Sequence, residues 1–184
     1  TELFVPMEEN TLLDDFILSL RIAMQGYKIA YCDKAYAIES GSANIEEEQK
    51  RKVRIAAGGL QSIRRLRPLL NPFRYGLLSF QYISHRVLRW SITPILLFLL
   101  LPVNLILVLA THFTPLYSVI FVLQVIFYLL AWTGASLARK QIKVKILLIP
   151  YYFTFMNFNV LKGFFYLKKH KGKGTWEKAN RADS

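Results

Sequence analysis

Charged residues are missing from one long stretch of an otherwise strongly basic chain. Residues 91–138 contain no Asp, Glu, Lys or Arg, a run of 48 positions in a protein of 184 residues with a formal net charge of +12. A membrane-spanning helix needs about 20 apolar residues. The run therefore fits two spans, with His112, Thr114 and Pro115 supplying the turn between them. The alternative, a buried helical hairpin in a soluble core, would need more covering chain than is present.

Acidic residues are missing from a second stretch. Residues 50–89 hold ten basic and no acidic residues, whereas residues 1–49 hold ten acidic and three basic ones. Lys and Arg accumulate beside the cytoplasmic ends of spans. This distribution predicts a multi-pass protein of the cell (plasma) membrane whose water-facing part is cytoplasmic. A basic block could also mark nucleic-acid binding, but its direct approach to a span favours anionic lipid headgroups or a phosphorylated ligand as partners.

Cysteine is nearly absent. Cys32 is single, so it has no partner for an internal disulfide and no companion ligand for a metal site, and we expect an ordinary buried residue. The chain opens at Thr1 with no Met and no signal-like segment. We interpret it as the C-terminal part of a longer protein.

Hydrophobic spacing and turn residues predict the elements before the first span. Asn10 or Thr11 can cap a helix that Gly26 ends. A helix in which Leu77, Tyr82 and several arginines alternate suits the membrane interface. The expected elements are a helix from about 11 to 25, strands 27–31 and 35–39 around an Asp33–Lys34 turn, a helix from 45 to about 70 ending near Pro68, and an interfacial helix 73–90.

A third hydrophobic stretch, residues 146–167, is interrupted by polar residues and by Pro150. It lies between the basic clusters 139–145 and 168–173. A simple span would place one cluster outside the cell, against the charge rule. A Pro-broken re-entrant or interfacial hairpin would keep both inside. The hairpin is favoured, and the span stays open.

Two adjacent carboxylates, Asp14 and Asp15, stand in the first turn of the first predicted helix. The helix dipole favours negative charge there, so acidic residues are common at such positions for structural reasons. A carboxylate held in this way could also serve as a general base. The pair alone does not decide between the two roles.

The wider pattern resembles the second half of a family 2 glycosyltransferase. There, an acidic pair opens a helix ending in Gly-Tyr, an Arg-rich helix with a Gly and a Gln follows, and a basic segment leads into membrane helices. The corresponding residues here are Asp14–Asp15, Gly26–Tyr27, Ala35, Arg51 to Gln61, Ser84 to Trp90, and a short tail at Trp176, Glu177, Lys178 and Arg181.

The resemblance implies an α/β fragment, the second half of a GT-A-like catalytic domain, followed by interfacial amphipathic helices and a membrane helical region. The implied boundaries are 1–67 for the catalytic part, 68–90 for the interfacial helix, 91–138 for two transmembrane helices, and 139–184 for a third membrane or re-entrant segment with a basic tail.

The resemblance also implies roles for individual residues. Asp15 falls on the family's catalytic base, which deprotonates the acceptor hydroxyl, with Asp14 as its neighbour. The family's Gln-x-x-Arg-Trp motif falls on residues 51–55, where Arg54 keeps the cation that would face the donor diphosphate. The motif's Gln is Arg51 and its Trp is Ile55 here, which argues against processive synthesis. Residues expected to bind the donor diphosphate or the acceptor are Arg51, Arg54 and Gln61, and those expected to form an interfacial collar are Arg74, His85, Arg86, Arg89 and Trp90.

Simpler roles stay open for several of these side chains. Arg51, Lys52 and Arg54 could sit at the lipid surface without binding substrate. Trp90 is more readily explained as an interfacial aromatic anchor, and Trp176 could anchor the tail. His85 is more readily explained as a structural hydrogen-bonding residue.

The donor half of such an enzyme would carry a nucleotide-binding region and an Asp-x-Asp motif that holds a divalent metal. No Asp-x-Asp occurs in this sequence. The resemblance therefore implies Mg or Mn and a nucleotide-sugar donor in the intact enzyme, neither bound by these residues alone, and no activity from them in isolation. The implied function is an inverting transfer of sugar to a saccharide or lipid-linked acceptor at the cytoplasmic face. The rival is a non-enzymatic membrane component, such as a transporter subunit or scaffold.

Overall fold

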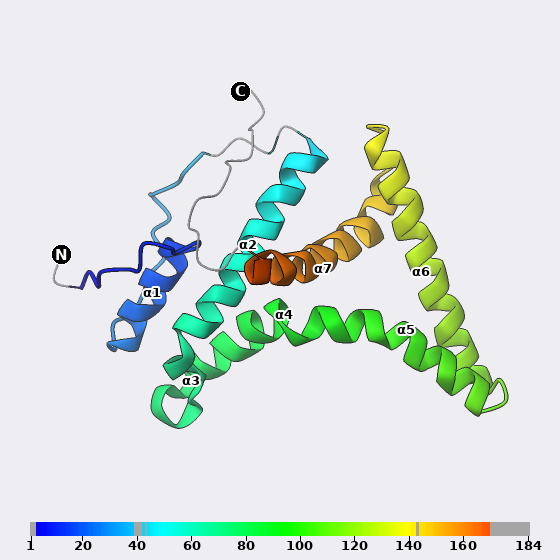
Figure 1. Ribbon diagram of the computed structural model, residues 1–184, viewed down its shortest axis with the longest axis horizontal. Helices are drawn as coiled ribbons and strands as arrows, with labels where there is room; N and C mark the ends of the chain where they lie inside the picture. The colour runs from blue at the N-terminus through cyan, green and yellow to red at the C-terminus, as the bar shows by residue number, and fades with distance from the viewer. Residues whose placement is uncertain (1–2, 39–41, 43, 143, 170–184) are drawn as a thin grey trace. The chain divides into compact units, whose positions relative to one another are not determined.

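The computed structural model of the protein (Figure 1) describes residues 3–38, 42, 44–142 and 144–169. Its contacts divide it into two units. Within the described ranges, the first unit comprises residues 3–90 with 162–169, and the second comprises Ser91–Leu161. We refer to them as the polar unit and the apolar unit. Every regular element in the described part of the chain is a helix.

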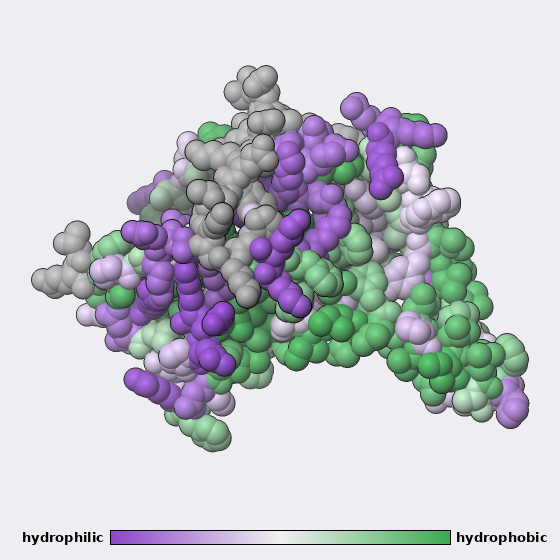
Figure 2. Space-filling view, viewed as in Figure 1, coloured by the Kyte–Doolittle hydropathy of each residue, from purple (hydrophilic) through white to green (hydrophobic). Residues whose placement is uncertain are grey.

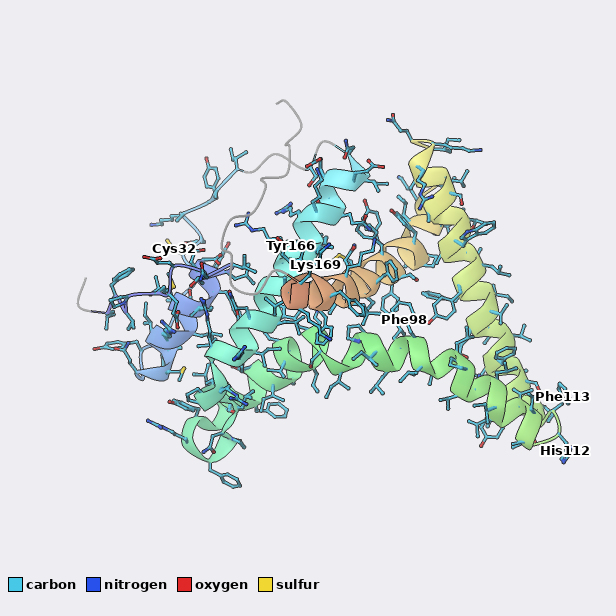
Figure 3. All side chains as sticks on the ribbon, viewed as in Figure 1. Cys32, Phe98, His112, Phe113, Tyr166 and Lys169 are labelled. Carbon is cyan, nitrogen blue, oxygen red and sulfur yellow. The ribbon has the colours of Figure 1, made fainter. Side chains whose placement is uncertain are left out.

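The expected α/β fold is therefore wrong for the described residues. Segment 27–31 and the described part of segment 35–39 are not strands, although a turn does join them, closed by a hydrogen bond from Ala35 N to Cys32 O of 3.4 Å. The apolar side chains that suggested strands are exposed, with Tyr31 at 92% and Ile38 at 90%. A strand needs a neighbouring backbone to pair with and a surface to cover, and neither is formed here. Cys32, expected to be buried, is also exposed (Figure 3).

The first helix, α1 (Asp14–Met24), is shorter than predicted. Leu13 occupies the N-cap and no side chain caps the helix, so the expected cap from Asn10 or Thr11 is wrong. Gly26 follows the helix with a φ of 94°, a left-handed conformation that favours glycine at helix ends. The start of α1 is instead held by contacts to the next helix, described below.

The second helix, α2 (Ile45–Arg65), begins with a side-chain cap. Asn44 Oδ1 accepts a hydrogen bond from Glu47 N at 2.8 Å. The first turn is acidic and the last turn is basic, which complements the helix dipole at both ends. The helix continues through Gly58–Gly59 but ends before the predicted limit, and a 3₁₀ helix, η1 (Arg67–Leu70), follows it.

The predicted interfacial helix 73–90 is three pieces: α3 (Pro72–Tyr82), a π-helical turn η2 (Ile83–Val87) and α4 (Leu88–Trp90). Asn71 caps α3 by accepting a hydrogen bond from Phe73 N at 3.0 Å. Gly76 interrupts the helical backbone with a φ of 51°, a value that the periodicity of the sequence does not reveal.

The polar unit has a small core where α1, η1 and α3 meet. Its buried members are Ile17, Leu66, Leu69 and Tyr82. Close helix contacts surround it: a Cβ added at Gly59 would lie 2.4 Å from the Trp90 ring, and one at Gly163 would lie 2.6 Å from Ala56 Cβ. Glycine is therefore required at both positions for the elements to approach this closely.

The apolar unit is built on a helical hairpin, α5 (Ile92–Ala110) and α6 (Pro115–Arg139). His112 and Phe113 lie at its tip (Figure 3). Both helices are long and apolar enough to cross a membrane, and only 17% and 6% of their most apolar windows are buried. The visible faces of α5 and α6 are largely hydrophobic, whereas hydrophilic side chains gather over α2 (Figure 2).

The last described helix, α7 (Lys145–Lys169), is continuous through Pro150. The expected Pro-broken hairpin is therefore wrong. Pro150 is the sixth residue of the helix, so its ring removes one backbone hydrogen bond near the helix start, where the ladder is only beginning. Whether α7 enters a bilayer stays a prediction. The tail residues Trp176, Glu177, Lys178 and Arg181 lie outside the described residues.

Candidate active site

The acidic pair lies at the exposed start of α1. Asp14 and Asp15 are both solvent-accessible, and Asp15 Oδ1 accepts a hydrogen bond from Phe16 N at 2.7 Å. The first-turn N–H groups of a helix have no partner within the helix, so this bond satisfies one of them. It also fixes one carboxylate oxygen of Asp15 and leaves the other available to a ligand.

One face of α2 holds the residues that precede Asp14. The Gln61 side chain makes two hydrogen bonds with this segment, accepting from Leu12 N at 3.0 Å and donating to Asn10 O at 2.7 Å. Further along α2, Arg65 hydrogen-bonds Thr11 Oγ1. The expected role of Gln61 in binding substrate stays a prediction, and the structure places its side chain against the segment that leads into the acidic turn.

The approach of the two elements is closest at Gly58. A Cβ added at this position would lie 2.6 Å from Leu13 Cγ. Gly58, Gln61 and Arg65 share one face of α2 because helical neighbours recur at three and four residues. The segment that leads into α1 therefore runs along this face in the opposite direction to α2.

Arg54 lies on the same face of α2, one turn before Gly58. The segment that enters α1 runs toward this end of the face. Its side chain is half-buried and makes no ion pair within the described residues. Arg51 lies a further three residues along the same face, 3.9 Å from Glu48 Oε2. Both predicted donor-binding arginines thus follow the face that holds the acidic turn, and they differ in that Arg51 pairs with Glu48.

Aromatic packing joins α1 to the segment before the apolar unit. The Phe16 ring meets the Trp90 ring edge-on at 5.2 Å, and the Arg86 guanidinium stands 5.3 Å from the centre of Phe16 and 5.5 Å from that of Trp90. Trp90 is only 7% exposed and packs on Gly59. Its interpretation as an aromatic anchor in lipid is therefore wrong: the ring is part of the polar unit's interior.

A pocket of about 410 Å³ opens beside this aromatic group. It lies between one face of α1 and the α3–η2 segment. Burial raises the pKa of Tyr82 to about 12, so its phenol is neutral at physiological pH. The residues around the pocket are Phe16, Leu20, Leu78, Gln81, Tyr82, His85 and Arg86.

The predicted collar is not one cluster. His85 and Arg86 line the pocket, but Arg74 stacks on Tyr75 at 5.3 Å and Arg89 is exposed outside the lining. His85 Nδ1 lies 2.8 Å from Ser84 Oγ and 3.2 Å from Gln81 O.

One known protein family matches most of this sequence. The sequence profile described as glycosyl transferase family group 2 matches residues 3–136, well over half of the chain. The chain belongs to this family. No curated protein and no solved structure matches it. The matched range of this family member contains the acidic turn, the α2 face and the whole pocket, and it ends within α6.

In this glycosyl transferase family member, the described residues include no group of three or more His, Cys, Asp or Glu side chains that could hold a metal ion. These residues by themselves therefore do not fit a divalent metal. The metal and the nucleotide-sugar expected from the resemblance stay predictions about the intact enzyme.

Sequence reasoning missed two parts of the site. It used Tyr82 only as part of an interfacial helix and gave neither Phe16 nor Tyr82 a place in the site, although both line the pocket. A usable signal was present, since Phe16 and Leu20 are four residues apart, as are Leu78, Tyr82 and Arg86, which predicts two helix faces that can meet. The role of Arg65 in holding Thr11 had no comparable signal, because the two residues are far apart in sequence.

Proposed function

We propose that the intact enzyme transfers a sugar, with inversion, from a nucleotide-sugar donor to a hydroxyl group of a saccharide or lipid-linked acceptor. The observation that carries the proposal is the exposed carboxylate of Asp15, at the head of α1 and fixed by Phe16 N. Family membership supports glycosyl transfer. The donor, the acceptor and the stereochemistry are parts of the proposal.

Asp15 would act as the general base. One carboxylate oxygen takes the proton of the acceptor hydroxyl while the hydroxyl oxygen attacks the anomeric carbon of the sugar. The bond between that carbon and the diphosphate oxygen breaks, and the electron pair leaves with the nucleoside diphosphate. A single displacement of this kind inverts the anomeric centre. The exposure of Asp15 supports the role, because an acceptor can reach it.

The α2 face would align the base with the departing diphosphate. Gln61 fixes the backbone on both sides of Thr11, and Gly58 lets Leu13 approach. Arg54, one turn away on the same face, offers a guanidinium whose paired N–H groups match phosphate oxygens. Its lack of an ion pair within the described residues leaves it available for that contact.

The location is part of the proposal. Two helices suited to crossing a membrane follow directly on a stretch of ten basic and no acidic residues. Basic residues next to a span favour the cytoplasmic side, where nucleotide-sugars are available to the active site.

The test is Asp15→Asn in the intact enzyme, assayed for release of nucleoside diphosphate. Loss of a general base lowers the rate by about 10²- to 10⁴-fold, and we expect a loss of that order. Asp33→Asn, at another exposed carboxylate of the polar unit, is the matched control and should retain wild-type turnover. Wild-type turnover by Asp15→Asn, with folding intact, would remove Asp15 from the mechanism.

A further inference from the structure

The pocket beside α1 is not used by the proposed transfer step. Its walls are mainly apolar, formed by Phe16 and Leu20 from α1 and Leu78 from α3. Polar groups stand on one helical segment only, at Gln81, His85 and Arg86. A site with an apolar wall and a cationic edge suits a ligand with an apolar chain and an anionic head.

The Arg86 guanidinium is held in place by aromatic rings and can bind an anion through its N–H groups. Its guanidinium lies against the rings of Phe16 and Trp90, at 5.3 and 5.5 Å from their centres. Such stacking occupies the flat faces of the group and leaves the N–H donors at its edge free. Within the described residues Arg86 makes no ion pair, with the exposed Asp14 and Asp15 or with any other carboxylate.

Tyr82 contributes an unmet hydrogen bond. Its side chain is buried, at 3% exposure, and its hydroxyl has no hydrogen-bond partner within the described residues. A buried hydroxyl without a partner is costly, and such groups in proteins commonly bind a ligand or water. The hydroxyl is closed off from the pocket in the unliganded protein, so a ligand oxygen reaches it once the Tyr82 side chain, which lines the pocket, shifts toward it.

The surroundings favour a membrane lipid over a soluble phosphate compound. On α3, the helix that supplies Leu78, the side chains of Phe73, Leu77 and Phe80 are exposed at 99%, 69% and 64%. Leu77 and Phe80 follow the break at Gly76 and lie three residues apart, so they form an apolar face, whereas Phe73 lies before the break. The segment that carries them belongs to the stretch with ten basic and no acidic residues, which attracts anionic lipid headgroups.

We propose that this pocket binds one anionic phospholipid, with its phosphate at Arg86, one of its oxygens accepting from the Tyr82 hydroxyl, and the first part of a chain against Phe16, Leu20 and Leu78. The site is independent of glycosyl transfer, so it stands even if the proposed reaction fails. A nucleoside diphosphate is the competing occupant, and the experiment below distinguishes the two.

Trp90 provides the reporter, since it contacts both Phe16 and Arg86. The full chain, with Trp132→Phe and Trp176→Phe, is placed in phosphatidylcholine vesicles that contain phosphatidylglycerol with brominated chains. Bromine quenches tryptophan at short range. We expect the brominated anionic lipid to quench Trp90 more than brominated phosphatidylcholine does at the same mole fraction.

Arg86→Gln should reduce the preference for the anionic lipid about fivefold. This ratio corresponds to the loss of about 1 kcal/mol, the contribution of one basic residue at an anionic surface. Arg89→Gln is the matched control, because Arg89 is exposed three positions away and lies outside the pocket lining. It should keep the preference. Equal losses in the two variants would show general surface attraction and overturn the proposal.

Tyr82→Phe separates binding from folding. Because the hydroxyl has no partner in the unliganded protein, the variant should melt no lower than wild type in detergent without anionic lipid, and it should lose part of the lipid preference. A lower melting temperature with unchanged preference would overturn the proposed contact. Displacement of the quenching lipid by a nucleoside diphosphate or by inorganic phosphate would assign the pocket to a soluble ligand instead.

Discussion

The contacts that stabilise the polar unit from within differ in kind from those that stabilise the apolar unit. In the polar unit, single residues carry the geometry: Gly59 admits the Trp90 ring, and Gln61 bonds backbone groups about fifty positions away. In the apolar unit, α5 and α6 expose most of their apolar surface, and Asn104 and Gln124 make one of the few polar bridges. The polar unit should therefore be sensitive to single substitutions, and the exposed faces of the apolar unit should tolerate many, although not at Gly134, where an added Cβ would lie 2.6 Å from Leu147 O.

The largest difference should appear with Gly59→Val. A Cβ at position 59 would lie 2.4 Å from the Trp90 ring, and a rigid ring cannot move aside without disturbing Phe16. Overpacking of this kind costs about 3 kcal/mol. Thermal unfolding followed by Trp90 fluorescence should show a much lower midpoint.

The counterpart in the apolar unit is Leu123→Val, at a side chain exposed at 60% on α6. It should change the free energy of unfolding by less than about 0.5 kcal/mol, as exposed substitutions usually do. Comparable losses from the two substitutions would break the comparison between the units.

A smaller loss is expected from Gln61→Leu. The substitution removes the partner of Leu12 N and of Asn10 O, so the stability loss should be about 1–2 kcal/mol. Because the same bonds hold the turn that bears Asp15, kcat should fall more than KM rises. Gln25→Leu is the control, since within the described residues the Gln25 amide bonds only its own helix, at Arg21 O. A Gln61→Leu enzyme with normal kcat would deny Gln61 a positioning role.

The same contrast explains what the sequence could predict. The hairpin of residues 91–138 depends on composition, and its two helices and its turn were predicted correctly. The strands at 27–31 and 35–39 were wrong, because alternating apolar residues predict a strand only if a partner covers them, and these are exposed. Asp15 in the first turn of a helix followed from local pattern. The roles of Gln61 and Trp90 did not, because each depends on a partner distant in sequence.

Within the apolar unit, removing the hydrogen bond between Asn104 and Gln124 should have a measurable effect on stability. Asn104 Nδ2 donates to Gln124 Oε1 at 3.0 Å, between α5 and α6. In a membrane such a bond contributes about 0.6 kcal/mol, and at most about 1.7. A double-mutant cycle with Asn104→Leu and Gln124→Leu, measured by unfolding in mixed micelles, should give a coupling energy near the lower value.

The control for that cycle is Thr133→Val, whose hydroxyl bonds only within its own helix, to Leu130 O at 2.9 Å. It should show no coupling to Asn104→Leu. A coupling above about 2 kcal/mol between Asn104 and Gln124 would mean that the apolar unit also depends on single residues.

The smallest expected effect is a loss of folding stability at acidic pH. The pKa of Glu8 is lowered from its ordinary value of 4.5 by a backbone hydrogen bond and by Arg21 and Arg65, which together outweigh desolvation. Desolvation also opposes the shift at Glu48, but hydrogen bonds from Ser42 and Lys52 lower its pKa. A carboxylate with a lowered folded-state pKa stabilises the fold above its unfolded-state pKa. That contribution is lost as the pH falls below about 4.5 and through the lowered values.

The apolar unit should not share this response, because residues 91–161 contain no acidic side chain. Single-tryptophan variants can separate the two: Trp90 reports the polar unit, and Trp132 reports α6. Between pH 6 and pH 3 the unfolding midpoint reported by Trp90 should fall, while that reported by Trp132 stays constant. Glu8→Gln should flatten the acid limb at Trp90, and Glu9→Gln, at an exposed neighbour, should leave it unchanged. If both tryptophans lost stability together on acidification, the two units would unfold as one cooperative body, and the contrast between them would not extend to stability.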